Sequence, residues 1–238
     1  MPNEVITIGG QIAVLAVLGL AGAAFRRQDF HLRWFVAALL LYVVYDVLLT
    51  RGMYQIPNWP PGANWNWLGK ILSTSGTLLL AALPAFGYAR AGIRLRQNKG
   101  LLVPLVVLAL FAALFIYLAL ADGAGRSDAE TIAFEWTMPG LDEELFYRGL
   151  LLLAMNEAFR ARWTVWSAPV GYGGLLTSVL FGLAHAMSFG QGGFDFDLMT
   201  FAVTGVPSLF LLWLRERTGS VLLPILAHNM ANGISTLF

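Results

Sequence analysis

Apolar segments of about 20 residues recur along the whole chain, and this pattern restricts the fold more than any other feature. A helix of that length crosses the hydrocarbon core of a bilayer, where an exposed backbone must satisfy its own hydrogen bonds. We therefore predict an all-α fold, a polytopic membrane helix bundle of about eight transmembrane helices. Seven spans are 7–25, 33–50, 67–88, 101–121, 164–187, 198–214 and 220–238, and the eighth, 141–159, carries charges.

Composition supports a single integral membrane domain over residues 1–238, in which we distinguish N-terminal spans in 1–135 from a core in 136–238 that carries charged and polar motifs. The chain is 58% hydrophobic and only 12% charged, against about 25% charged residues in an average soluble domain. The absence of cysteine excludes disulfides and thiolate metal sites. A net charge of +1 argues against a nucleic-acid partner. We expect a multi-pass protein of the bacterial inner membrane, surrounded by lipid.

Basic residues predict how the spans alternate, because Lys and Arg favour cytoplasmic loops. Counted in chain order, they follow the first, third, fifth and seventh spans, which are 7–25, 67–88, 141–159 and 198–214. The intervening loops hold only Arg51, Lys70 and Arg126. This alternation predicts an even number of spans with both termini outside the cytoplasm. The basic residues concerned are Arg26, Arg27, Arg33, Arg90, Arg94, Arg96, Lys99, Arg160, Arg162, Arg215 and Arg217.

The span 141–159 holds Glu143, Glu144 and Arg148. An ionisable side chain near the bilayer centre costs at least about 2.5–3.5 kcal/mol, so this cluster indicates a compensating pairing or a function. We expect Pro139-Gly140 to break a preceding helix and Asp142 to be the N-cap of the next. The two glutamates would then occupy the first helical turn, where the helix dipole stabilises carboxylates.

Helical spacing separates the roles of the two glutamates. Glu144 and Arg148 are four residues apart and face one another, so we predict a buried ion pair. Glu143 points elsewhere and is left free for chemistry, with Tyr147 on its face as a possible hydrogen-bond donor. The alternative is that these charges form only a packing ion pair within the membrane.

Two later spans carry polar residues of the same kind. His185 closes the sequence Phe181-Gly-Leu-Ala-His185, and His228 lies one helical turn before Asn232. A single intramembrane histidine is often only a packing residue hydrogen-bonded to a carbonyl. Glu, His, and His with Asn on three successive polar-bearing spans favour a shared site inside the bundle. His31, in a basic loop, is read as a solvated residue.

These motifs resemble the CPBP family (CAAX protease and bacteriocin-processing, or Abi) of intramembrane proteases, which includes the Rce1-type prenyl endopeptidases. The resemblance rests on Glu143-Glu144-x-x-x-Arg148, Phe181-x-x-x-His185 and His228-x-x-x-Asn232, which occur here in the family's order. It covers about residues 139–232. Residues 1–135 resemble the family only in being a set of membrane spans.

The resemblance implies an intramembrane endopeptidase that cleaves a membrane-associated peptide or protein. Glu143 with His185 would deprotonate the attacking water. His228 and Asn232 would donate hydrogen bonds to the developing oxyanion. Glu144 and Arg148 would orient the helix and the base.

Family members are commonly named metalloproteases, so the cofactor is either none or one zinc ion. His-Glu-x-x-His is missing, which excludes a zincin, although Glu143, His185 and His228 could make a three-ligand zinc site. The sequence shows no obvious second-shell carboxylate for either histidine. We therefore favour metal-free, glutamate-dependent hydrolysis.

Other functions remain open. One is a non-catalytic membrane scaffold or bacteriocin-immunity factor, and another is a proton-coupled small-solute transporter. No inverted repeat supports a transporter, and Asp46 lacks the partner motif of an aspartyl dyad, so it is read as a packing or interface residue. The glycine-rich segment 188–197 is read as a flexible connector rather than a gate. We assign the aromatic residues Trp59, Trp65 and Trp67 to an interfacial belt.

Overall fold

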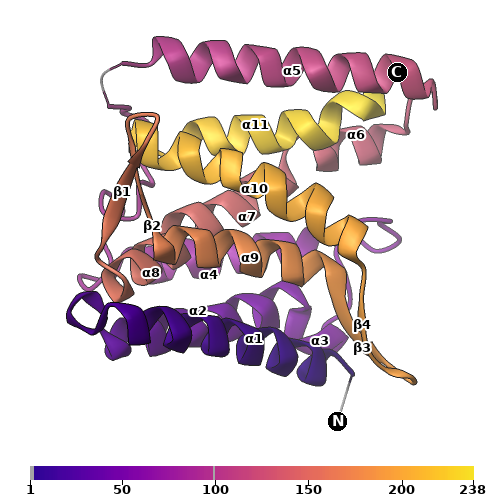
Figure 1. The fold of residues 1–238 in the computed structure, drawn as a ribbon. Helices are drawn as coiled ribbons and strands as arrows, with labels where there is room; N and C mark the ends of the chain where they lie inside the picture. Colours follow the sequence, from indigo (N-terminus) through magenta and orange to yellow (C-terminus); the bar gives the residue numbers. More distant parts are fainter. Residues whose placement is uncertain (1–2, 99) are drawn as a thin grey trace.

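The computed structural model describes residues 3–98 and 100–238 and is mostly helical (Figure 1). Long helices run roughly along one direction in stacked layers, with α1 and α2 on one outer face and α5 on the other. The main packing contacts between helices are those of α10 with α9, of α11 with α7, and of α2 with both α4 and α8. The principal helices are α1 (Asn3–Phe25), α2 (Leu32–Leu49), α4 (Trp67–Ala81), α5 (Leu102–Asp122), α7 (Met138–Glu144), α8 (Leu152–Ala158), α9 (Tyr172–Ala186), α10 (Leu198–Thr218) and α11 (Leu222–Gly233).

Each predicted span overlaps a helix, and within the described residues four helices are long and apolar enough to cross a membrane. These are α1, α2, α5 and α10. The others are shorter: α4 and α9 have 15 residues each and α11 has 12. The eight-span count therefore stays a prediction, and helix α4 ends at Ala81, well before the predicted limit of 88.

Two antiparallel hairpins correct the purely helical prediction. Strands β1 (Arg162–Val165) and β2 (Ala168–Gly171) occupy the start of the predicted span 164–187, so helix α9 begins only at Tyr172. Strands β3 (Met187–Gly190) and β4 (Gly193–Phe196) replace the connector predicted over 188–197. Phe189 pairs with Phe194 across this hairpin, their rings 5.1 Å apart, and Gly193 has a φ of 106° that a side chain would oppose.

The charged segment forms one continuous helix, which corrects its predicted start. It begins with α7 at Met138, passes through a π-helical stretch, η2 (Leu145–Leu151), and continues as α8. Pro139 lies in the first turn, where its missing N–H costs nothing, so Pro139-Gly140 starts the helix instead of breaking one. Glu143 and Glu144 therefore lie beyond the first turn, away from the stabilising end of the helix dipole. The π-helical geometry is a feature often found at functional sites.

The predicted basic loops gather at one end of the bundle. The α1–α2 connection, which includes η1 (Arg27–Asp29), meets the end of α8 through a bridge between Phe30 and Phe159. The connection before α5 meets the α10–α11 turn, because the backbone N–H of Asn98 donates to the carbonyl of Thr218. Hairpin β1–β2 lies at this basic end and β3–β4 at the opposite end (Figure 1).

The tryptophan-rich loop packs against a short helix, α6 (Ala129–Glu135). The Trp65 ring stacks on Phe134 at 4.9 Å, and Trp67 meets the same ring edge-on at 5.1 Å. Glu130 accepts hydrogen bonds from the Trp65 backbone and the Trp67 indole. Trp59 is exposed, and the proposed interfacial belt stays a prediction. Two short elements, α3 (Arg51–Tyr54) and η3 (Ile234–Leu237), complete the fold.

Candidate active site

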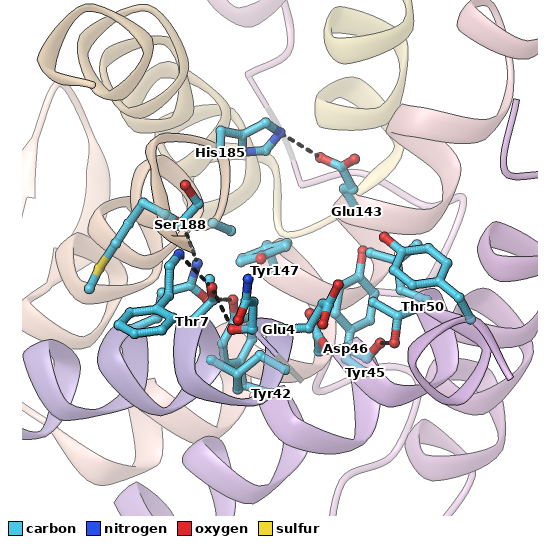
Figure 2. A pocket seen from close by; sticks show the side chains of 18 residues that line it. Glu4, Thr7, Tyr42, Tyr45, Asp46, Thr50, Glu143, Tyr147, His185 and Ser188 are labelled. Atoms are coloured by element: carbon cyan, nitrogen blue, oxygen red, sulfur yellow. Dashed lines mark hydrogen bonds and ion pairs between the residues drawn. The ribbon is translucent and has the colours of Figure 1, made fainter. Parts of the chain in front are cut away.

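Glu143 lies at the centre of a polar cluster at the end of the bundle opposite the basic loops. Its Oε1 is 2.5 Å from the Lys70 Nζ. Its Oε2 is 4.0 Å from His185 Nε2 and 3.9 Å from His228 Nε2, and it has no hydrogen-bond partner among the described residues. Figure 2 shows the Glu143 carboxylate facing His185. One carboxylate oxygen is thus anchored and the other faces two imidazoles.

His185 comes from the last turn of α9, where its own helix fixes its ring. The Nδ1 atom is 2.8 Å from the carbonyl oxygen of Phe181. Because a carbonyl only accepts, Nδ1 carries the hydrogen, and Nε2 in the neutral ring is an acceptor facing Glu143. The Phe181 ring lies 4.6 Å from the imidazole. The Phe-x-x-x-His spacing therefore positions the histidine in a defined tautomer.

His228, on α11, is held by the other glutamate. Its Nδ1 is 2.8 Å from Glu144 Oε1, and that oxygen also accepts from Arg148 at 3.1 Å. Arg148 is fully buried and donates to the Ser208 hydroxyl at 2.6 Å. The predicted Glu144–Arg148 ion pair is confirmed. The structure adds that Glu144 is also the carboxylate partner of His228.

Lys70 and Asp142 are site residues that the sequence analysis missed. Lys70 lies within α4 with 8% of its surface exposed, not in an outer loop. Asp142 is fully buried inside α7, not an N-cap, and its Oδ2 is 3.2 Å from the Lys70 Nζ. Its oxygens also accept hydrogen bonds from Tyr45 at 2.7 Å and Ser73 at 2.6 Å. The feature of the sequence that could have identified Lys70 as a site residue is its position inside the apolar span predicted over 67–88.

Asn232 and Tyr147 border the cluster without contacting Glu143 by a hydrogen bond in the described structure. The Asn232 amide donates to Glu135 Oε2 at 3.0 Å, and Asn232 lines the same cavity as His228. Tyr147 is buried and lines a different cavity together with Glu143. The hydrogen bond predicted from Tyr147 to Glu143 is therefore not formed.

Glu143 and His185 stand in the wall between two cavities. A cavity of about 410 Å³ lies toward α1, α2 and strand β3 and has many polar side chains, including Thr7, Tyr42 and Asp46. A second cavity of about 250 Å³ lies toward α5, α9, α10 and α11. Its lining is mainly apolar apart from the polar residues of the cluster, and includes Phe111, Phe115, Phe181, Val203, Pro207 and Leu211. The Glu143 carboxylate therefore borders a cavity on each of two sides.

The fit of a metal ion can be tested on Glu143, His185 and His228. Zinc bonds of about 2.0–2.2 Å in a tetrahedron place ligand atoms roughly 3.3 Å apart, and the observed separations of 3.9 and 4.0 Å are longer than this. Among the described residues, no group of three or more such side chains is close enough to hold a metal. Histidines that bind a metal usually donate their other ring N–H to a carboxylate. Glu144 is such a carboxylate for His228, whereas the sequence showed none for either histidine.

Comparison with known proteins relates the second half of the chain to one family. Residues 127–234 match the family model described as type II CAAX prenyl endopeptidase Rce1-like. This segment contains every motif residue of the cluster, and at family level it indicates a CAAX-type intramembrane protease. The similarity to the Rce1-like family is therefore established for residues 127–234.

One curated relative is an uncharacterized 24.3 kDa protein from Escherichia coli, with 32% identity over 133 residues. The match covers 55% of this chain and 54% of the relative, so the chain spans about half the length of that protein. No solved structure gives a significant match. Lys70 and the first cavity's α1 and α2 walls lie outside the segment that the family model matches.

Proposed function

We propose that this protein is an intramembrane endopeptidase of the bacterial inner membrane that hydrolyses a peptide bond in a membrane-associated peptide or protein. The observation that carries the proposal is the Glu143 carboxylate. One of its oxygens is held by Lys70, while the other faces the Nε2 atoms of His185 and His228 within 4.0 Å. Such a group in an apolar bundle is suited to activating water.

The proposed reaction begins with a water molecule bound to Glu143 Oε2 and His185 Nε2. Both atoms are hydrogen-bond acceptors in the neutral-imidazole form, so together they orient both hydrogens of the water. Glu143 accepts one proton as the water oxygen attacks the scissile carbonyl carbon. The same carboxyl group then returns that proton to the departing amine as the C–N bond breaks. Glu143 is therefore the general base and then the general acid.

His228 is proposed to stabilise the negative charge that develops on the carbonyl oxygen. Glu144 accepts the Nδ1 hydrogen, orients the ring and stabilises the imidazolium form, whose Nε2–H can then donate to the oxyanion. Arg148 fixes Glu144 in turn. Asn232 has a second amide hydrogen besides the one donated to Glu135. Losing one oxyanion donor costs about 10²–10³ in rate.

The proposed reaction uses no metal. If zinc binds, Glu143, His185 and His228 are the residues that would hold it, and it would supply Lewis-acid activation of water. Their separation requires these side chains to move closer before they could coordinate an ion together. The proposal therefore predicts that a chelator leaves activity unchanged.

The test uses the purified protein in detergent and a library of fluorogenic membrane peptides. Glu143→Gln keeps the shape of the side chain and removes the base, so cleavage should fall by at least about 10². Glu157→Gln, at the basic end and bonded to Arg90 and Arg160, is the matched control and should retain activity. Equal cleavage by wild type and Glu143→Gln would refute the assignment, and zinc-restored activity after chelation would favour the metal site. No cleavage by any variant would favour a non-catalytic membrane scaffold.

A further inference from the structure

Polar side chains of α1 and α2 converge on the larger cavity beside Glu143. Thr7 and Gln11 lie one helical turn apart on α1, and Tyr42 and Asp46 lie one turn apart on α2. The opposite faces of both helices carry exposed apolar residues, such as Val17 and Leu40, as expected next to lipid. These two apolar helices therefore direct their polar residues toward the space beside the proposed catalytic group.

Most polar groups in this wall already have partners. Gln11 donates to the carbonyls of Leu183 and Met187 and accepts from Tyr42. Tyr45 donates to Asp142. These bonds fix the wall of the cavity, and two of its carboxylates are still available to a ligand.

Glu4 and Asp46 are the two carboxylates that remain. Both line the cavity (Figure 2) and interact electrostatically, and no side chain of the described residues forms an ion pair with either. The Asp46 Oδ2 is buried without a hydrogen-bond partner among the described residues. No Lys or Arg of the described residues lines the cavity. Asp46 as a whole is half-buried, but leaving one carboxylate oxygen buried without a partner is costly, and an ionisable residue in a membrane helix marks a functional site.

We propose that this cavity binds a cationic side chain of the substrate, lysine or arginine, adjacent to the scissile bond. The inference rests on the proposed peptidase function, because Glu143 and His185 line the same cavity. The volume of about 410 Å³ exceeds a single water's share of about 30 Å³ more than tenfold, so it admits a long side chain. Glu4 and Asp46 supply the charges that bind the ammonium or guanidinium group.

The test measures binding separately from cleavage, in nanodiscs of neutral lipid. The probes are amphipathic peptides N-methylated at the candidate scissile bond and differing at one flanking residue, Lys, Arg, Gln or Leu. The Lys and Arg peptides should bind wild type at least about tenfold more tightly than the Gln peptide, as for hydrogen bonds to a charged group. The double variant Glu4→Gln/Asp46→Asn should lose that preference. Asp122→Asn, an exposed acid at the end of α5, should retain it.

Cleavage of the unmethylated peptides distinguishes the two proposals. Glu143→Gln should abolish cleavage and keep the binding preference for the cationic peptides. A preference in binding without any cleavage by wild type would refute the peptidase function and leave the cation site standing. Equal affinity of wild type for the Lys and Gln peptides, or a preference that survives in the double variant, would overturn the cation site.

Discussion

Lys70 supplies one ammonium group to two neighbouring carboxylates, Asp142 and Glu143. All three side chains are nearly or fully buried, so none of the charges is well solvated. Removing the shared cation would leave two like charges next to each other. The position of Glu143 therefore depends on a residue of α4 as much as on its own helix.

The change Lys70→Met tests this dependence. It should destabilise the protein by about 3–5 kcal/mol, because it leaves buried charges uncompensated. Lys70→Met/Asp142→Asn should recover part of the loss, because it removes one of those charges. Thermal unfolding in detergent measures both variants, with the exposed Arg126→Met as control. Equal stability of Lys70→Met and wild type would contradict the charge-balance account.

Glu144 offers a second test at the residue scale. Glu144→Gln keeps a hydrogen-bond acceptor for His228 but removes the charge that stabilises the imidazolium form. We expect kcat to fall by about 10² or more, with little change in KM, because the effect is on the transition state. Glu135→Gln, which keeps an acceptor for Asn232, is the matched control. A change confined to KM would assign Glu144 to substrate binding instead.

Residue spacing along a helix was enough to predict some of the site. Glu144 and Arg148 are one turn apart, so their ion pair follows from helical geometry. Lys70 and Glu143 are 73 residues apart, and no local rule links them. Asp142 was assigned to an N-cap because the helix start was placed too late, and its buried partners come from α2 and α4.

At the scale of elements, a close approach of α7 and α11 brings Glu144 to His228. Gly140 lies at this contact: a Cβ there would be 2.5 Å from Asn229 Oδ1 and 2.7 Å from the Ile225 carbonyl oxygen. The Gly140 N–H also donates to Asn229 at 2.8 Å. The two helices can be this close only because the residue has no side chain.

Gly140→Ala should therefore separate α7 from α11 and harm both stability and activity. Overpacking of this kind costs about 1–3 kcal/mol, and we expect a lower midpoint of thermal unfolding. Gly9→Ala is the control, because a Cβ at Gly9 meets nothing within 4 Å. An unchanged unfolding midpoint and unchanged cleavage in Gly140→Ala would show that the helices can separate without cost.

Hydropathy predicted where helices occur better than where they begin and end. The run 164–187 is largely apolar, so the hairpin at its start looked like part of a span. Pro169 in fact lies opposite Thr164 in the hairpin. In the same way, the segment 188–197 contains enough glycine to look like a connector, although its phenylalanines pair across two strands.

At the scale of the whole molecule, the site and the basic loops lie at opposite ends. The larger cavity is lined by the start of α1, the end of α2 and strand β3, whereas the basic connections meet at the other end. The sequence predicts that those loops share one side of the membrane, and in the structure they lie at one end of the bundle. Because basic loops favour the cytoplasm, the site end should face away from it.

The chain contains no cysteine, which makes this orientation simple to measure. Gln191 lies at the exposed tip of hairpin β3–β4, and Gln28 lies in the exposed α1–α2 connection. We expect a membrane-impermeant maleimide to label Gln191→Cys in intact cells and to label Gln28→Cys only after the cells are opened. The reverse pattern would place the site end on the cytoplasmic side.

The position of Glu143 between two different cavities also has a consequence for where cleavage falls along a substrate. One side of the carboxylate adjoins a space lined by many polar side chains, and the other a space with fewer of them. A substrate peptide that fills both spaces should therefore have mainly apolar residues on one side of the scissile bond and more polar residues on the other. We therefore expect the proposed peptidase to cut where the hydropathy of the substrate changes, so that moving this change by one residue moves the cut by one residue.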